Sequence, residues 1–240
     1  MRAYLAQARA EIRLTLTQGE SLLVTLGIPL ILLVGLDVAH IVPTGTRREI
    51  TFLAPGILSL AIMATGLVSL AIATAFERNY GVLKRLGATP LGRPALLAAK
   101  TSSIAVVEII QTAVILLVGT ALGWHPLGHV AEAAAAIVLG TVAFSGIGLF
   151  LAGALKAEVV LGLSNALYLV MLMLGGMAFP ISRLPGALHA VAVLLPASAL
   201  SQALVHSLGT GGAVPLSAWA VLVIWAVGAP ALAVSTFSWE

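Results

Sequence analysis

The sequence predicts an all-α integral membrane protein with six transmembrane helices. Its mean hydropathy of +1.10 and its content of only 9% charged residues over 240 positions exclude a water-soluble domain, which carries far more polar side chains. Apolar runs of about twenty residues, the length that crosses a bilayer, recur along the chain. The predicted spans are Leu22–Ile41, Phe52–Ala75, Thr101–Leu122, Val130–Leu155, Val159–Phe179 and Pro215–Phe237.

The first twenty residues, 1–20, predict an amphipathic helix that lies in the membrane interface before the first span. Apolar and basic positions separate onto two sides of a helix: Leu5, Ala8, Ile12 and Leu16 on one, and Arg2, Arg9, Arg13 and Thr17 on the other. A solvated helical tail fits the same periodicity and stays open as an alternative.

One charged segment, 76–100, separates the second span from the third. It holds five of the chain's 12 Lys and Arg residues, and such a cluster cannot lie in lipid, so we expect it to face the cytoplasm. Apolar and basic residues fall on opposite faces of a helix: Val82, Leu83 and Leu86 on one, and Arg78, Lys84 and Arg85 on the other. This pattern predicts a short amphipathic helix of about nine residues on the inner membrane surface.

The ends of this short helix are marked by residues with special backbone preferences. Gly87 is expected to stop the helix in a left-handed conformation. Thr89 and Pro90 are expected to start the next helix, as N-cap and as first helical residue.

The distribution of positive charge predicts the orientation. With the N-terminus inside, the cytoplasmic segments carry nine Lys and Arg residues, and the external loops carry three, Arg47, Arg48 and Arg183. This satisfies the positive-inside rule, and an even number of spans returns the C-terminus to the cytoplasm. Because no single face gathers the positive charge, we expect no nucleic-acid partner.

The stretch 180–212 is expected to form a re-entrant helical hairpin on the external side. Its two apolar arms, Ala187–Leu195 and Ala197–Leu208, are each too short to cross a bilayer, and Pro196 separates them. A pair of helices on the membrane surface is the alternative. We therefore expect a single transmembrane domain over 1–240, with the helix at 1–20, the loop at 76–100 and the hairpin as its additions.

The charged loop carries a family resemblance. The run Glu77-Arg78-Asn-Tyr80-Gly81-Val-Leu83-Lys-Arg85-Leu86-Gly-Ala-Thr89-Pro90-Leu91 resembles the signature loop of the export-type ABC transporter permeases, the membrane subunits of bacterial drug and antibiotic exporters. Gly92 stands where the family usually has a hydroxyl residue. The resemblance implies that the loop holds a coupling helix that fits a groove on a separate ATPase subunit. The implied coupling residues are Glu77, Arg78, Tyr80, Gly81, Leu83, Arg85, Leu86, Thr89 and Pro90.

The resemblance also implies the setting of the protein. It implies a multi-pass protein of the bacterial cytoplasmic (inner) membrane with both termini in the cytoplasm, and two copies side by side as a homodimer. Residues 1–20 become a connecting helix packed against the coupling helix, and the prolines of 180–212 belong to an external lid over the exit path. The implied activity is export by alternating access, as in multidrug efflux and antibiotic resistance.

No nucleotide site is visible in the chain. A G-x-x-x-x-G-K-[ST] phosphate loop is missing, and Lys100-Thr101 matches only its last two letters. We therefore expect no enzymatic activity and no cofactor on this chain, with ATP and Mg²⁺ bound by the partner ATPase. No metal site is expected either, because Pro126 and Gly128 separate His125 from His129 and the chain has no cysteine.

Two polar residues, Glu108 and Gln111, lie one helical turn apart within the third span. An intramembrane carboxyl suggests a function by default, because burying it without a partner is costly. We favour a structural Glu108–Gln111 hydrogen bond that braces two helices. The alternatives are a proton-coupled secondary transporter that uses Glu108, or a polytopic membrane enzyme, which would need a polar cluster that the sequence does not show.

The fifth span offers a flexible and partly polar lining, which includes Asn165 and Met171. In the resembling family the second and fifth spans face the substrate path at the dimer axis. We therefore expect Met63 and Thr65 on the second span to line this path with Asn165 and Met171, although core packing is the commoner explanation for such residues. The expected cargo is an amphipathic drug, antibiotic or lipid-like small molecule, in contact with membrane lipid.

Overall fold

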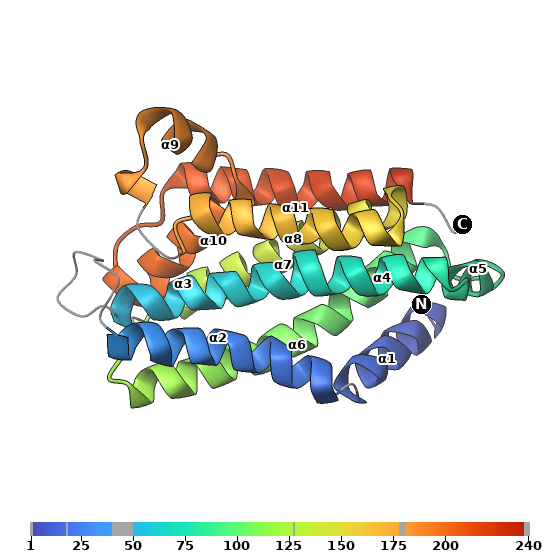
Figure 1. The fold of residues 1–240 in the computed structure, drawn as a ribbon, viewed down its shortest axis with the longest axis horizontal. Helices are drawn as coiled ribbons and strands as arrows, with labels where there is room; N and C mark the ends of the chain where they lie inside the picture. The colour runs from blue at the N-terminus through green and yellow to red at the C-terminus, as the bar shows by residue number, and fades with distance from the viewer. Residues whose placement is uncertain (1, 18, 40–49, 127, 178–180, 238–240) are drawn as a thin grey trace.

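Helices make up most of the described part of the protein. The computed structural model describes residues 2–17, 19–39, 50–126, 128–177 and 181–237, and no strand occurs in these ranges. Figure 1 shows most of the helices side by side along one axis. The elements are α1 (Arg2–Thr17), α2 (Gly19–Ala39), α3 (Ile50–Met63), the π-helical η1 (Ala64–Ser69), α4 (Leu70–Asn79), α5 (Val82–Gly87), α6 (Arg93–Ala121), α7 (Val130–Ala154), α8 (Ala157–Leu174), the 3₁₀ turn η2 (Ile181–Arg183), α9 (Gly186–Ala192), α10 (Pro196–Leu204), the π-helical η3 (Val205–Thr210) and α11 (Leu216–Thr236).

The predicted all-α membrane fold is confirmed. Five helical stretches are long and apolar enough to cross a membrane: Ile50–Asn79, Arg93–Ala121, Val130–Ala154, Ala157–Leu174 and Leu216–Thr236. The first predicted span falls on α2, a helix of 21 residues whose described apolar part, Leu23–Ala39, is shorter. The predicted ends at Ile41 and Phe179, and the external Arg47 and Arg48, lie outside the described residues.

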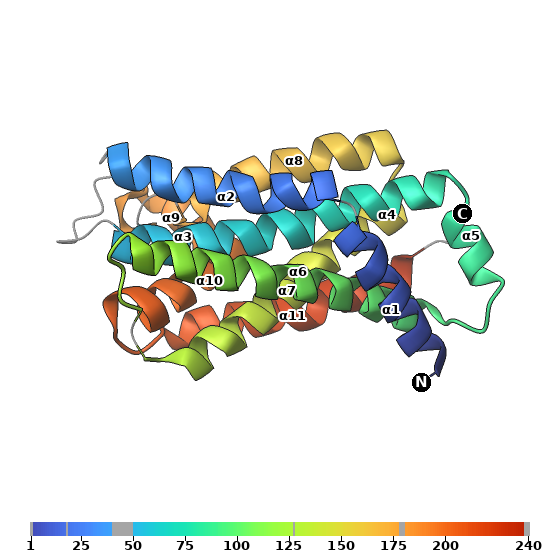
Figure 2. The ribbon, with the colours of Figure 1, turned by 90° about the horizontal axis from the view of Figure 1, so that it is seen from below.

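α7 is the central helix of the bundle. It packs against α11, α4, α10, α3 and η1, and its Ala- and Gly-rich face lets these neighbours approach closely. The main hydrophobic cluster surrounds it, with Leu58, Phe144 and Leu200 among its fully buried members. A second cluster, which contains Leu83 and Phe237, lies where α5 meets the ends of α6 and α11. Figure 2 shows α1 and α5 at this end of the bundle and α9 and α10 at the other.

The π-helical η1 interrupts the longest helix, at its closest contact with α7. A β-carbon on Gly66 would lie 3.0 Å from the Phe144 side chain, and one on Gly148 would lie 2.6 Å from the Gly66 carbonyl oxygen. Backbones can approach this closely only where both residues lack a side chain. Gly148 therefore allows the close contact between α7 and η1.

Much of the charged segment 76–100 is helical. α4 continues to Asn79 and α6 begins at Arg93, so the part between the two long helices covers 80–92, and the cytoplasmic position of 76–100 stays a prediction. Its helix, α5, has six residues where about nine were expected. The left-handed glycine is Gly81, with φ of 74°, and Gly87 is helical. The expectation for Gly87 was wrong because the chain needs its sharp turn on entering α5 from α4.

The start of the following helix also differs from the prediction. The Thr89 hydroxyl donates to the Leu86 carbonyl oxygen at 2.6 Å, so Thr89 closes α5 and does not cap a new helix. Leu91 is buried in the second hydrophobic cluster, which holds the chain out of helical conformation there. α6 begins after Gly92, with Pro94 in its first turn, where a missing N–H is tolerated.

α1 turns a mixed face toward the bundle. Ala8 and Glu11 are buried against α6, whereas Leu5 and Leu16 are half exposed. The two leucines of the predicted apolar side therefore face away from the protein. An interfacial helix would bury such leucines in lipid, and the position of α1 in the membrane interface stays a prediction.

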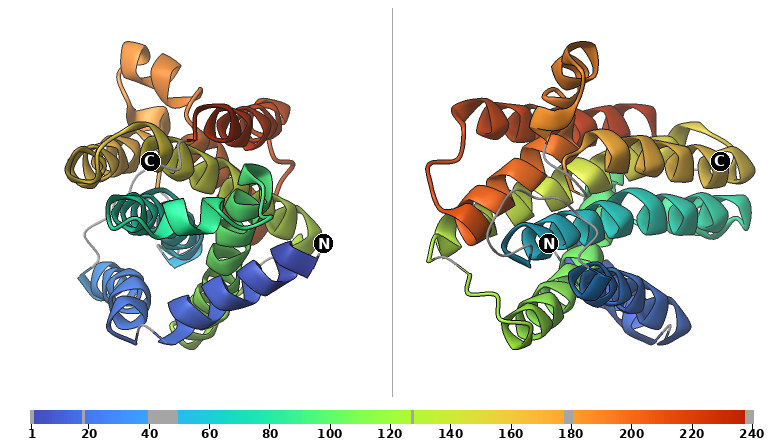
Figure 3. Two further views of the ribbon diagram at one scale, coloured as in Figure 1. Left: turned by 90° about the vertical axis from the view of Figure 1, so that its right-hand side faces the viewer. Right: turned by 60° about the vertical axis from the view of Figure 1, so that its left-hand side comes forward.

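The predicted break at Pro196 is confirmed. Pro196 is the first residue of α10, and α9 meets the continuous α10–η3 helix at 84°. α10 and η3 are buried among α3, α7 and α11, while α9 carries the exposed Leu188 and Val191 and stands out from the bundle in Figure 3. The two arms thus differ in burial; their depth in the membrane stays a prediction, and Pro180 lies outside the described residues.

The contact between η1 and α7 predicts that replacing Gly148 by alanine destabilises the protein much more than the same replacement at Gly162. Gly148→Ala places a methyl group against the backbone of η1, so we expect a loss of about 1–3 kcal/mol from overpacking. Gly162→Ala on α8 is the control, because a β-carbon there meets nothing within 4 Å. Thermal unfolding of each purified variant in detergent gives the melting temperatures to be compared. Equal melting temperatures for the two variants would contradict the close contact.

Candidate functional site

α5 is a short helix that is anchored on one side and exposed on the other. Leu83 is fully buried in the second hydrophobic cluster, while Tyr80 is 71% exposed and Arg85 is exposed. Leu86 packs partly against the same cluster as Leu83. Figure 1 shows α5 at the extreme end of the bundle, beyond the ends of α4 and α6. One side of α5 is therefore held by apolar burial and the other is available to another molecule.

Arg78 is directed inward rather than toward solvent. Its guanidinium donates to the carbonyl oxygen of Gly153 at 2.5 Å and to that of Leu155. These are carbonyls at the C-terminal end of α7, where a helix lacks internal partners and favours a positive charge. Arg78 thus joins the base of α5 to the central helix, which differs from the solvent-exposed face expected from its helical position.

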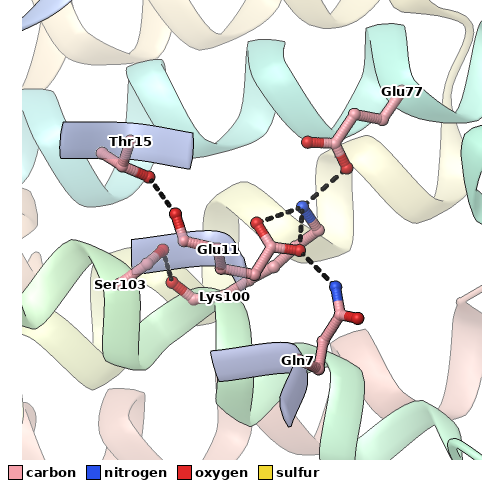
Figure 4. A network of polar contacts seen from close by, with 6 residues as sticks. All are labelled: Gln7, Glu11, Thr15, Glu77, Lys100 and Ser103. Carbon is pink, nitrogen blue, oxygen red and sulfur yellow. Dashed lines mark hydrogen bonds and ion pairs between the residues drawn. The ribbon is translucent and has the colours of Figure 1, made fainter. Parts of the chain in front are cut away.

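A buried ion-pair network lies beside this anchor (Figure 4). Lys100 on α6 is 1% exposed. Its ammonium group lies 2.6 Å from Glu77 Oε2 on α4 and 3.2 Å from Glu11 Oε1 on α1. One cation therefore connects three helices. Lys100 ends the charged segment that we expect in the cytoplasm, and pairing with two carboxylates offsets the cost of burying its charge within the protein.

Neighbouring polar groups complete the network. Gln7 donates to Glu11 Oε1 at 2.8 Å, one helical turn away on α1, and Ser103 donates to the Lys100 carbonyl oxygen at 2.8 Å. Further along the same interface, the hydroxyls of Tyr4 and Ser102 lie 2.8 Å apart. These contacts fix α1 across α6, close to the base of the α5 loop.

The predicted coupling residues therefore divide into two groups. Glu77, Arg78 and Leu83 make contacts inside the protein, and Gly81 provides the turn into α5. The exposed members are Tyr80, Arg85, Thr89 and Pro90. Sequence reasoning missed the pairing of Lys100 with Glu11 and Glu77, since residues 89 and 23 positions apart show no spacing pattern. The sequence feature that could have indicated a buried ion pair was the position of Lys100 at the edge of an apolar run.

The two intramembrane polar residues brace different helices. Glu108 Oε2 accepts a hydrogen bond from Thr141 on α7. Gln111 donates to the Thr25 carbonyl oxygen on α2 at 3.0 Å and accepts from Thr65 at 3.2 Å. The predicted bond between Glu108 and Gln111 was wrong, because each side chain finds a partner on another helix. A bracing role for both residues fits this geometry.

The four predicted path residues lie in unequal surroundings. Met63, Thr65 and Met171 are buried within the single chain. Only Asn165 is exposed, and it borders a cavity of about 290 Å³ between α2, the α3–η1–α4 helix and α8. The role of these residues in a substrate path stays a prediction. Nothing in the described part of the chain brings three His, Asp or Glu residues together as a metal site.

The Lys100 network predicts a large loss of stability on removal of the cation. Lys100→Met leaves Glu11 and Glu77 as facing carboxylates with no positive partner, which we expect to lower the free energy of unfolding by about 3–5 kcal/mol. Denaturation in detergent measures the change. Lys156→Met, at an exposed position, is the control and should leave the midpoint unchanged. A Lys100→Met protein as stable as the wild type would refute a structural network.

A comparison with known protein families identifies the family to which this chain belongs. The sequence profile of the ABC-2 type transporter family matches residues 3–208, from the first turn of α1 into η3. A search of the curated proteins finds no match. The matched range contains α5, the Lys100 network, both intramembrane polar residues and the four path residues. It covers most of the chain, so the protein belongs to the ABC-2 type transporter family and is a multi-pass permease subunit of an ABC transporter.

Proposed function

We propose that this chain is the membrane subunit of an ATP-driven exporter, in which two copies work with two separate ATPase subunits. The family implies an ABC ATPase partner. The observation that supports a docking site is the position of α5 at the end of the bundle. Tyr80 and Arg85 are exposed there, while buried Leu83 holds the helix in place. Tyrosine and arginine are enriched among the residues that dominate binding at protein interfaces.

The anchors around α5 support a mechanical coupling. A push on α5 is transmitted to α7 through Arg78 and to α6 and α1 through the Glu77–Lys100–Glu11 network. Because these links are short and buried, the segment moves as one unit rather than bending at the loop. In this mechanism, closure of the ATPase pair tilts α4, α6 and α1 together, and the path opens outward.

The cavity beside Asn165 is the candidate for the substrate path. Its lining combines apolar side chains such as Ile28 and Leu60 with the polar Thr25 and Tyr168. Such a mixed surface suits an amphipathic cargo. Neighbouring outward faces of α2 and α8 are apolar and exposed, as at Ile31 and Leu169, so lipid or the second copy has to cover them.

Docking through α5 predicts loss of the partner from a paired substitution. We expect Tyr80→Ala with Arg85→Glu to lower the vanadate-sensitive ATPase activity that co-purifies with the tagged chain about tenfold or more, since both changes remove candidate hot-spot contacts. Glu77 is left intact because it binds Lys100. Arg183→Glu, an exposed charge reversal in η2, is the matched control. Full co-purified activity in the double variant, with normal membrane insertion, would rule out docking at α5.

The proposed orientation in the bacterial inner membrane gives a separate prediction. The chain has no cysteine, so single cysteines can be labelled without background. Ala213→Cys before α11 should react with an impermeant thiol reagent on intact cells, because it lies outside. Ala88→Cys, after α5, should react only after permeabilisation. Both alanines are exposed. The reverse labelling pattern would place α5 outside and overturn the proposed coupling.

A further inference from the structure

A cavity of about 490 Å³ lies between α6 and α7, away from the cavity beside Asn165. Its walls are almost entirely apolar, and both helices contribute to them. Ile109 and Val138 at its rim are 68% and 60% exposed, and the lining alanines Ala113 and Ala134 are exposed as well. The cavity therefore opens sideways on the outer surface of the helices, where the bilayer would be.

The interior of this cavity holds one carboxyl group with an unused oxygen. Glu108 is 1% exposed and lines the cavity. Its Oε2 accepts from Thr141, whereas Oε1 has no hydrogen-bond partner among the described residues. The buried hydroxyl oxygen of Thr112, one turn further along α6, is likewise without a partner and lines the same cavity.

These two unpartnered atoms indicate what the cavity would bind. Glu108 lies near the middle of α6, about 22 Å along the helix from Arg93. A carboxylate at this depth requires a cation or another hydrogen-bond donor, because no water replaces the missing partner in an apolar environment. An ammonium group satisfies both needs, since it supplies charge and three donors.

We propose that the groove between α6 and α7 binds a lipophilic amine that enters from the bilayer. The ammonium group donates to Glu108 Oε1 and to the Thr112 hydroxyl, and the apolar body lies along Ala113, Ala134 and Ile137. The volume falls within the range of small-molecule sites, about 300–1,000 Å³. This site goes beyond the proposed docking and path residues, and its occupancy does not depend on them.

The test uses two probes of the same shape and different charge. Full-length protein in lipid nanodiscs is dialysed against 1-naphthylmethylamine or the neutral 1-naphthylmethanol at pH 7, with empty nanodiscs subtracted. We expect saturable binding of one amine per chain, and affinity for the alcohol at least tenfold lower. Glu108→Gln keeps an acceptor for Thr141 but removes the charge, and it should weaken amine binding at least tenfold without changing the alcohol.

A second pair of variants tests the groove itself and does not rely on Glu108. Ala134→Leu fills the cavity from an exposed position, so it should abolish amine binding. Ala135→Leu is the matched control, because Ala135 is the neighbouring exposed alanine and does not line the cavity. It should bind the amine like the wild type.

Several outcomes would overturn the proposal. One is an absence of saturable amine binding above empty nanodiscs. Others are equal affinity for amine and alcohol, or unchanged amine binding in Glu108→Gln or Ala134→Leu. A disulfide between two copies of an Ala134→Cys protein in the membrane would show instead that a second copy covers the groove.

Discussion

The position of Lys100 between Glu11 and Glu77 is the constraint on which the architecture of the α5 end of the bundle depends. A single buried ammonium group joins α1, α4 and α6, and none of these helices could keep its place at this end if one charge were left unpaired. The network lies in the part of α6 that precedes the predicted span, which begins at Thr101. It explains why α1, whose leucines face outward, is nevertheless held firmly across the bundle.

α6 makes side-chain polar contacts with several other helices of the bundle. Lys100 binds α1 and α4, Glu108 binds α7, and Gln111 binds α2 and η1. In an apolar surrounding such contacts define which helices are neighbours more specifically than dispersion does, because each unsatisfied polar atom is costly. The same reasoning makes the unused oxygen of Glu108 conspicuous: it is the member of this set that the described chain leaves without a partner.

Hydropathy predicted most of the fold because length and composition suffice to identify a spanning helix. The α5 segment was also predictable from its amphipathic pattern, and the break at Pro196 was predictable because proline acts locally. Pairings across the bundle were not. The partner of Glu77 is 23 residues away and that of Glu108 is 33 residues away, and a single sequence carries no signal for such contacts. For the same reason it did not distinguish buried Met63 from exposed Asn165.

The π-helical η1 changes the phase of the longest helix. A π turn takes up more residues than an α turn, so side chains before Ala64 and after Ser69 do not share a common stripe even when their spacing suggests it. Both halves of the helix contact α7, but the first half also packs against α2, α6 and α10, whereas the second half packs against α8. The buried faces of the two halves of this continuous helix therefore differ in phase. A helical wheel drawn through its full length would misassign which residues point toward the interior.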